Sequence, residues 1–115
     1  MIKTEFGIID EIDTNKDYGH YETEKYNCVY IDDDIYINDW WEQLNAVKTF
    51  YHNLSRPGYA LARHGVTIIP PGSVKQFHHI VISDPRFKHD HLLFSLSVVI
   101  QKAIIENKHM IHFGI

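Results

Sequence analysis

Apolar and polar positions alternate along the first part of the chain. Within residues 2–12, strand-forming side chains recur at every second position, beginning with Ile2, Thr4, Phe6 and Ile8. This period of two is typical of a strand with one buried face. Residues 26–31, YNCVYI, are rich in the aromatic and β-branched types that favour strands. Both segments therefore predict strands, and the polar stretch between them predicts a connecting turn.

Residues 39–54, DWWEQLNAVKTFYHNL, have a helical period instead. The apolar positions are spaced i, i+4, i+7, i+11 and i+14, at Trp40, Leu44, Val47, Tyr51 and Leu54. Asp39 is a preferred N-cap residue, and Glu42 three positions later completes a variant of the capping box. Pro57 cannot continue a helix. The pattern predicts one amphipathic helix over 39–54.

Shorter elements follow. Residues 59–69 predict two short strands that meet at His64–Gly65, the second being VTII. Ser73 is then placed to cap a short helix. The buried stripe of this helix is expected to contain Val74, Phe77 and Val81.

Residues 90–106 are the most apolar helical segment. Only a narrow polar stripe interrupts it, at His91, Ser95, Lys102 and Glu106. Such a helix is expected to be the most buried in the domain. Asn107 can adopt the left-handed conformation that ends a helix, and HMIHFGI follows as a final strand.

Together these elements predict an α+β fold for one domain over residues 1–115. Its two layers would be a mostly antiparallel sheet of about four or five strands and about three helices. No repeat, linker or low-complexity tract indicates a second domain, and 115 residues suffice for one core.

Composition also indicates a cellular compartment. No apolar run approaches the roughly 18 to 20 residues of a membrane span, so no membrane partner is expected. Cys28 is the only cysteine, which excludes an internal disulfide and fits a reducing compartment. We therefore expect a cytoplasmic protein, and the sequence leaves self-association open.

Charge is distributed unevenly along the chain. Through Asn45 there are twelve acidic and three basic residues, a formal charge of −9. From Ala46 onward there are three acidic and eight basic residues, a charge of +5. Such asymmetry can mark a partner-facing surface, or the two halves can lie together and neutralise each other. The acidic first half argues against nucleic acid, because phosphate binding needs a basic surface.

One acidic stretch has the spacing of a calcium loop. Asp13, Asn15, Asp17 and Glu24 stand at positions 1, 3, 5 and 12 of residues 13–24. An EF-hand also requires flanking helices and a glycine at position 6, where this chain has tyrosine. The segments on either side read as strands. We therefore predict a solvated turn and no calcium site.

Other cofactor and nucleophile sites are not supported either. The nine histidines include the pairs His89/His91 and His109/His112. On a helix, residues i and i+2 point apart, and on a strand, residues i and i+3 face opposite sides. Neither pair would share a metal ion, and no metal or other cofactor is expected. Cys28 lies mid-strand without a catalytic signature, which favours an inert thiol.

Two classes of function remain, and binding is favoured over catalysis. In the first, a small protein-binding module engages a basic protein, as an inhibitor or immunity-type protein does. Three adjacent like charges repel one another, so a fold-only account explains a turn but not its charge. The partner-binding residues would be Asp32, Asp33, Asp34, Asp39, Trp41 and Glu42.

Trp41 can serve in two ways. It can bury against the strands together with Trp40, or it can remain exposed as an aromatic anchor for the partner. The second class of function is an anion-binding or small-molecule-binding protein or an enzyme. Its ligand would be held by Arg56, Arg63, His64 and Lys75.

Overall fold

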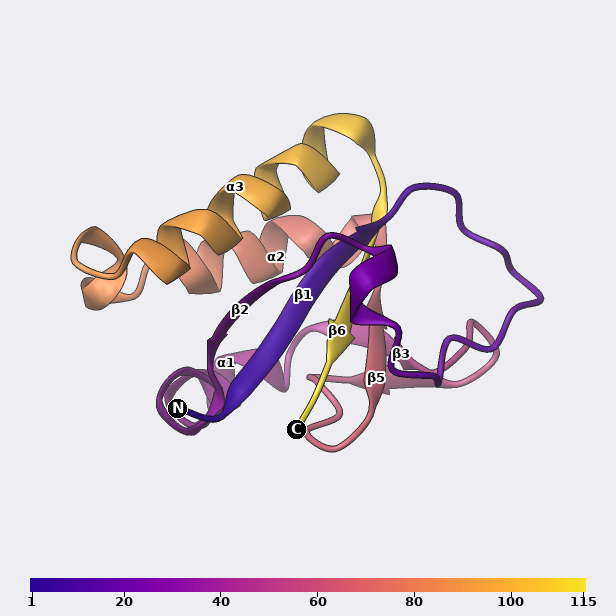
Figure 1. The fold of residues 1–115 in the computed structure, drawn as a ribbon, viewed down its shortest axis with the longest axis horizontal. Helices are drawn as coiled ribbons and strands as arrows, with labels where there is room; N and C mark the ends of the chain where they lie inside the picture. The colour runs from indigo at the N-terminus through magenta and orange to yellow at the C-terminus, as the bar shows by residue number, and fades with distance from the viewer.

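A computed structural model describes residues 1–115, and an antiparallel sheet of six strands forms its centre. The strands lie in the order β2-β1-β6-β5-β3-β4. Their bounds are β1 Lys3–Ile9, β2 Val29–Asp32, β3 Lys48–Tyr51, β4 Pro57–Tyr59, β5 Val66–Ile69 and β6 His109–Phe113. The first and last strands pair at the middle of the sheet, where Glu5 faces Phe113 (Figure 1).

Helices α2 and α3 pack together across one face of this sheet (Figure 1). The helices are α1 Asn38–Leu44, α2 Pro71–Ile82 and α3 His91–Glu106, with shorter turns η1 Thr23–Lys25, η2 Asp33–Ile37 and η3 Pro85–Lys88. The main core of nineteen buried residues lies under them. At its centre Phe6 of β1 stacks on Phe77 of α2, with ring centroids 5.2 Å apart.

The opposite face of the sheet is covered by a loop. Residues 10–28 connect β1 to β2 and contribute Tyr18 to a second core with Ile68, Ile111 and Phe113. The amide of Tyr18 donates to the carbonyl of His52 (2.6 Å), which ties the loop to the residue that follows β3. The predicted connection between two antiparallel strands is thus present, and it also packs against the sheet.

The predicted α+β class is confirmed, and the six strands exceed the predicted four or five. The segment VTII is β5, and the last strand is β6. Helix α3 begins after Asp90, whose carboxylate accepts from the amide of Leu92 (2.9 Å). It ends at Asn107, which has the left-handed conformation with φ 54°. The predicted left-handed end at Asn107 is therefore confirmed, and Asp90 is the N-cap.

The single helix predicted for 39–54 is wrong. Helix α1 ends at Leu44, and Lys48–Tyr51 form β3 between β4 and β5. Thr49 is buried there, and its hydroxyl donates to the carbonyl of Ala60 (2.8 Å). Residues 48–51 contain β-branched and aromatic types, so pairing on both sides outweighs the helical spacing. Asp39 is not the N-cap either, because η2 precedes it and α1 starts at Asn38.

Two other local predictions need correction. Helix α2 starts at Pro71, whose ring fixes a helical φ, so Ser73 lies inside the first turn. The hydroxyl of Ser73 donates instead to the carbonyl of Lys48 (2.6 Å). The strand expected over 59–63 is reduced to Tyr59 at the end of β4, because Ala60 has a positive φ of 63°. The predicted buried stripe of α2 is confirmed.

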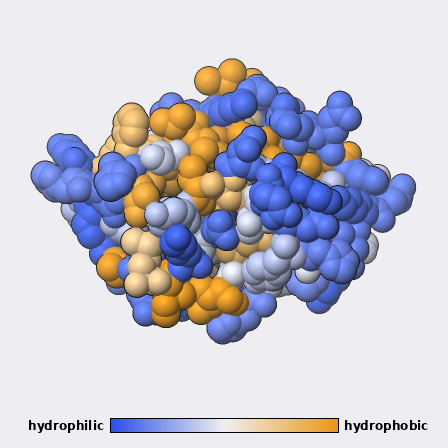
Figure 2. Space-filling view, viewed as in Figure 1, coloured by the Kyte–Doolittle hydropathy of each residue, from blue (hydrophilic) through white to orange (hydrophobic).

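The expectation that the 90–106 helix would be the most buried does not fit its outer face. Five of the sixteen residues of α3 are buried, against five of the twelve residues of α2. Phe94, Val98 and Ile105 are exposed, and hydrophobic surface extends over α3 in the upper left of Figure 2. The sheet lies on only one side of α3, so half of its apolar circumference has nothing to pack against.

Candidate functional site

The three carboxylates at positions 32–34 have different roles in the structure. Asp32 accepts from the amide of Asp34 (3.1 Å) and so caps η2. Asp33 is buried, and its carboxylate pairs with Arg63. Its amide donates to the carbonyl of Ile2 (2.7 Å). Only Asp34 of the three is exposed. The charge that a turn alone did not explain is therefore accounted for at Asp33 by the buried ion pair.

A guanidinium links this corner to the end of α2. Arg86 of η3 contacts Asp39 of α1 (2.9 Å) and Asp84 (2.7 Å). The indole of Trp40 donates to the same carboxylate of Asp84 (2.9 Å). Asp84 is only 8% exposed, and hydrogen bonds from Arg86 lower its pKa to about 2. The pKa of Arg86 is raised in turn by its bond to Asp84. Asp84 therefore remains charged at every physiological pH.

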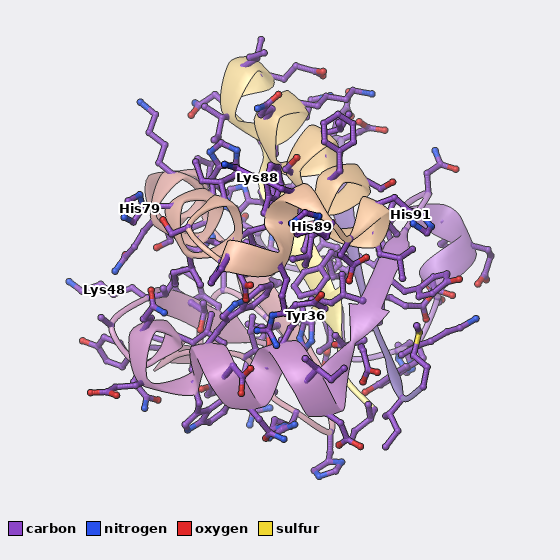
Figure 3. All side chains as sticks on the ribbon, turned by 90° about the vertical axis from the view of Figure 1, so that its left-hand side faces the viewer. Tyr36, Lys48, His79, Lys88, His89 and His91 are labelled. Atoms are coloured by element: carbon purple, nitrogen blue, oxygen red, sulfur yellow. The ribbon has the colours of Figure 1, made fainter.

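Tyr36 connects η2 to the start of α3. Its hydroxyl donates to the carboxylate of Asp90, and the guanidinium of Arg86 lies 4.6 Å from its ring centroid. Burial and the bond to Asp90 raise the pKa of Tyr36. Figure 3 shows Tyr36 between the η2–α1 segment and the segment that leads into α3, on which His89 lies. The tyrosine thus stays neutral and acts as a structural bridge.

A pocket of about 410 Å³ opens beside this network. Its apolar side is formed by Trp40 and Ile80, and its charged side by Asp39, Asp84 and Arg86. Two carboxylates against one guanidinium leave a negative balance. The pocket therefore presents a carboxylate-rich wall to any group that enters it.

The predicted partner-binding residues differ in their exposure to solvent. Asp34, Asp39 and Glu42 are exposed, and Asp33 is buried. Trp41 is half-buried against the main core, with the guanidinium of Arg63 at 5.8 Å from its ring. It is therefore not a free aromatic anchor.

Sequence reasoning missed Ile35, which is 45% exposed beside Asp34. The apolar stretch IYI at 35–37 does not reveal which of its side chains is exposed, because η2 turns the segment and buries Tyr36 and Ile37. Arg86 was also missed. The ion-pair partner of Arg86 on α1, Asp39, lies 47 positions away and gives no local signal.

The alternative anion-binding residues do not converge. Arg63 is engaged by Asp33 and Asn38, and His64 lies beside the carbonyl of Ile115 (3.3 Å). Arg56 and Lys75 are exposed on separate elements. None of these four residues lines a pocket.

The acidic and basic halves of the chain do meet, through a small number of ion pairs. Asp33–Arg63, Asp39–Arg86 and Asp10–Lys108 each join one half to the other. Partial neutralisation within the fold therefore accounts for part of the asymmetry. Asp34 and Glu42 form no ion pair, and their charge faces solvent.

The calcium-like residues are used in local turns. Asp13 accepts from the amide of Asn15 (2.9 Å), and Asp17 accepts from the amide of Gly19 (2.7 Å). Nowhere do three His, Cys, Asp or Glu side chains gather as a metal site would require. Cys28 is partly buried, and burial raises its pKa to about 12, so its thiolate is scarce at neutral pH.

His112 is a buried histidine at the centre of the sheet. The hydroxyl of Thr4 donates to the carbonyl of Phe113 (3.2 Å), so it must accept from Nε2 of His112 (2.5 Å). Nδ1 then carries a lone pair, and it has no hydrogen-bond partner. Burial lowers the pKa of His112 to about 3. This histidine is therefore a neutral core residue.

Comparison with family models, curated proteins and solved structures finds no match. No helix of the structure has the length and apolar character that crossing a membrane requires.

Proposed function

We propose that this protein is a small binding module that engages a cationic protein through its η2–α1 corner. An inhibitor or immunity-type protein of a basic partner is the type that this fits. The observation that carries the proposal is the pairing of unneutralised charge with apolar area. Asp34 and Glu42 are exposed without ion-pair partners, and Ile35 exposes apolar surface beside Asp34. Carboxylates steer a cationic partner, and apolar area supplies affinity.

The corner is held in one conformation before any partner arrives. Asp33 anchors η2 to Arg63, and Asp39 anchors α1 to Arg86. A surface that is already ordered loses less conformational entropy on binding. This supports recognition by a preformed surface, with little rearrangement of the corner.

The neighbouring pocket extends the same surface. Asp39 lies on its rim and is more than half exposed. A lysine or arginine side chain of the partner can enter the pocket and contact this carboxylate.

A protein is favoured over nucleic acid or membrane as the partner, because exposed carboxylates repel phosphate groups. The lone cysteine fits a reducing compartment, and we propose the cytoplasm as the place of action. The function needs no cofactor.

The test compares two double variants with the same change in charge. Asp34→Asn with Glu42→Gln neutralises the corner, and Asp17→Asn with Glu24→Gln neutralises the 10–28 loop. A partner purified on the wild-type protein should associate with the corner variant at least about tenfold more slowly at low salt. The loop variant should associate at nearly the wild-type rate.

High salt should remove most of the difference, because exposed charges are screened. Association rates by surface plasmon resonance at low and high salt measure this. Equal rates for the corner variant and the wild type would overturn the proposal. Equal slowing by both variants would also overturn it, because net charge alone would then explain the effect.

A further inference from the structure

The outer face of α3 carries an exposed apolar strip, which the rest of the chain touches at Phe94 through the ring of Phe87. Phe94, Val98 and Ile105 are 58%, 49% and 83% exposed. At about 100° per residue, the three side chains lie within about 40° of one another around the helix axis. Contiguous exposed apolar surface of this kind marks an interaction site.

The strip has the spacing of a helix–helix seam. With Gln101 included, its residues follow one another at intervals of four, three and four, as apolar seam positions do in paired helices. We define Phe94, Val98, Gln101 and Ile105 as the α3 strip. It contains no charged residue, so its occupant must be uncharged along the seam.

We propose that the α3 strip binds the same strip of a second copy of this chain, with the two α3 helices antiparallel. A two-fold axis midway between Val98 and Gln101 brings Phe94 of one copy against Ile105 of the other. The same contact occurs again at the other end of the strip. The two most exposed side chains therefore cover each other, and the strip is its own complement.

Charges beside the strip agree with this arrangement. The axis relates residue i of one copy to residue 199 − i of the other, so His91 comes within two residues of Glu106, and Ser95 within two residues of Lys102. Lys108, which comes level with His91, is already paired with Asp10 and Glu106 of its own copy. The antiparallel orientation also places each helix N-terminus beside a C-terminus, which is the favourable order of helix dipoles.

The exposed area predicts a weak dimer. Partial exposure of three large side chains leaves apolar surface on the order of 300 Å² on each copy. Two copies then bury about 600 Å² from the strip, well below the roughly 1,200 Å² at which stable interfaces begin. We expect a dissociation constant on the order of 10–100 µM.

Sedimentation velocity over about 5–500 µM protein in reducing buffer tests the proposal. The wild type should pass from monomer to dimer. Phe94→Glu and Ile105→Lys should each remain monomeric throughout, because each puts unpaired charges into the seam at both ends. An equimolar mixture of these two variants should form a heterodimer, because the introduced carboxylate faces the introduced ammonium at one end and the native pair remains at the other.

Ile82→Glu is the control, since this exposed isoleucine lies on α2 and should leave dimerisation unchanged. Urea unfolding verifies that each variant is folded, and Phe94→Gln with Ile105→Gln provides a second, uncharged test of the same seam. A wild type that stays monomeric at all concentrations would overturn the proposal. Dimerisation that survives the single variants, or a mixture that stays monomeric, would overturn it equally.

Discussion

Asp84 and His112 are both buried ionisable side chains, and the fold treats their charges in opposite ways. Asp84 receives hydrogen bonds from the side chains of Arg86 and Trp40, together with the amide of Arg86. His112 has one bond, to Thr4, and one nitrogen without a partner. The pKa is lowered in both cases, so Asp84 stays charged and His112 stays neutral. Burial is tolerated when donors match the charge, or when the charge is given up.

The largest expected loss of stability comes from removing the carboxylate of Asp84. Asp84→Ala leaves the guanidinium of Arg86 and the indole of Trp40 without their shared acceptor. Removing one partner of a buried ion pair costs several kcal/mol, and partial exposure of Arg86 reduces this to about 2–4 kcal/mol. Urea unfolding at pH 7 measures the free energy. A cost below that of Asp39→Asn would show that the network is not centred on Asp84.

Acid should destabilise the fold through His112, which is neutral in the native state. An unfolded histidine takes up a proton below a pKa of about 6.5, whereas native His112 does so only near 3. Stability is therefore lost as pH falls through this window, by about 2 kcal/mol at pH 5. Loss linked to Asp84 begins lower, as pH approaches about 4 where the unfolded carboxyl takes up a proton, and continues down to its native pKa of about 2.

Unfolding free energies of wild type and His112→Leu between pH 7 and 4 separate these contributions. The variant should lose less stability on acidification. Some slope will remain, because burial also lowers the pKa of His78 and of His109. Identical pH profiles would mean that native His112 titrates with the same pKa as in the unfolded chain.

Removing the single partner of His112 should have a smaller effect. Thr4→Val keeps the side-chain shape and deletes the hydroxyl, which leaves Nε2–H of His112 without an acceptor. A buried unsatisfied donor costs about 1–2 kcal/mol. Thermal unfolding at pH 7 checks this, with Thr23→Val in the partly exposed loop as the control. An unchanged melting temperature would contradict the assigned tautomer.

The smallest effect is expected at the exposed end of the Asp84 network. Asp39→Asn removes the ion pair between Asp39 and Arg86, both of which are well exposed. Such pairs contribute about 0–1 kcal/mol. The difference from wild type should also shrink in high salt. A cost that persists in high salt would indicate that Asp39 is part of the buried network and not its rim.

The sequence predicted elements whose signals are local. The stretch from Asp90 to Asn107 contained its own cap, apolar stripe and left-handed end, and these specify α3 without reference to the rest of the chain. Residues 48–51 contained a misleading signal, because Val47 and Tyr51 continue the helical spacing of α1. Their strand conformation depends on β4 and β5, which no local pattern reveals.

The same limit applied to the candidate site. The charge run at 32–34 was evident, but the partner of Asp33 is Arg63, thirty positions away. Asp39 could be identified as a polar residue near a helix start, whereas its contact with Arg86 depends on how α1 meets η3. Which carboxylates remain free for a partner therefore follows from tertiary contacts alone.

The position of β6 also determines the order in which the chain can fold. This strand lies between β1 and β5, so the sheet remains two separate pieces until residues 109–113 enter it. The β1–β6 pairing joins residues about a hundred positions apart, a high contact order that slows folding. During synthesis, most of the chain would leave the ribosome before its central strand exists. The exposed inner edges of β1 and β5 are then open to wrong partners, which makes this nascent chain a candidate client of chaperones.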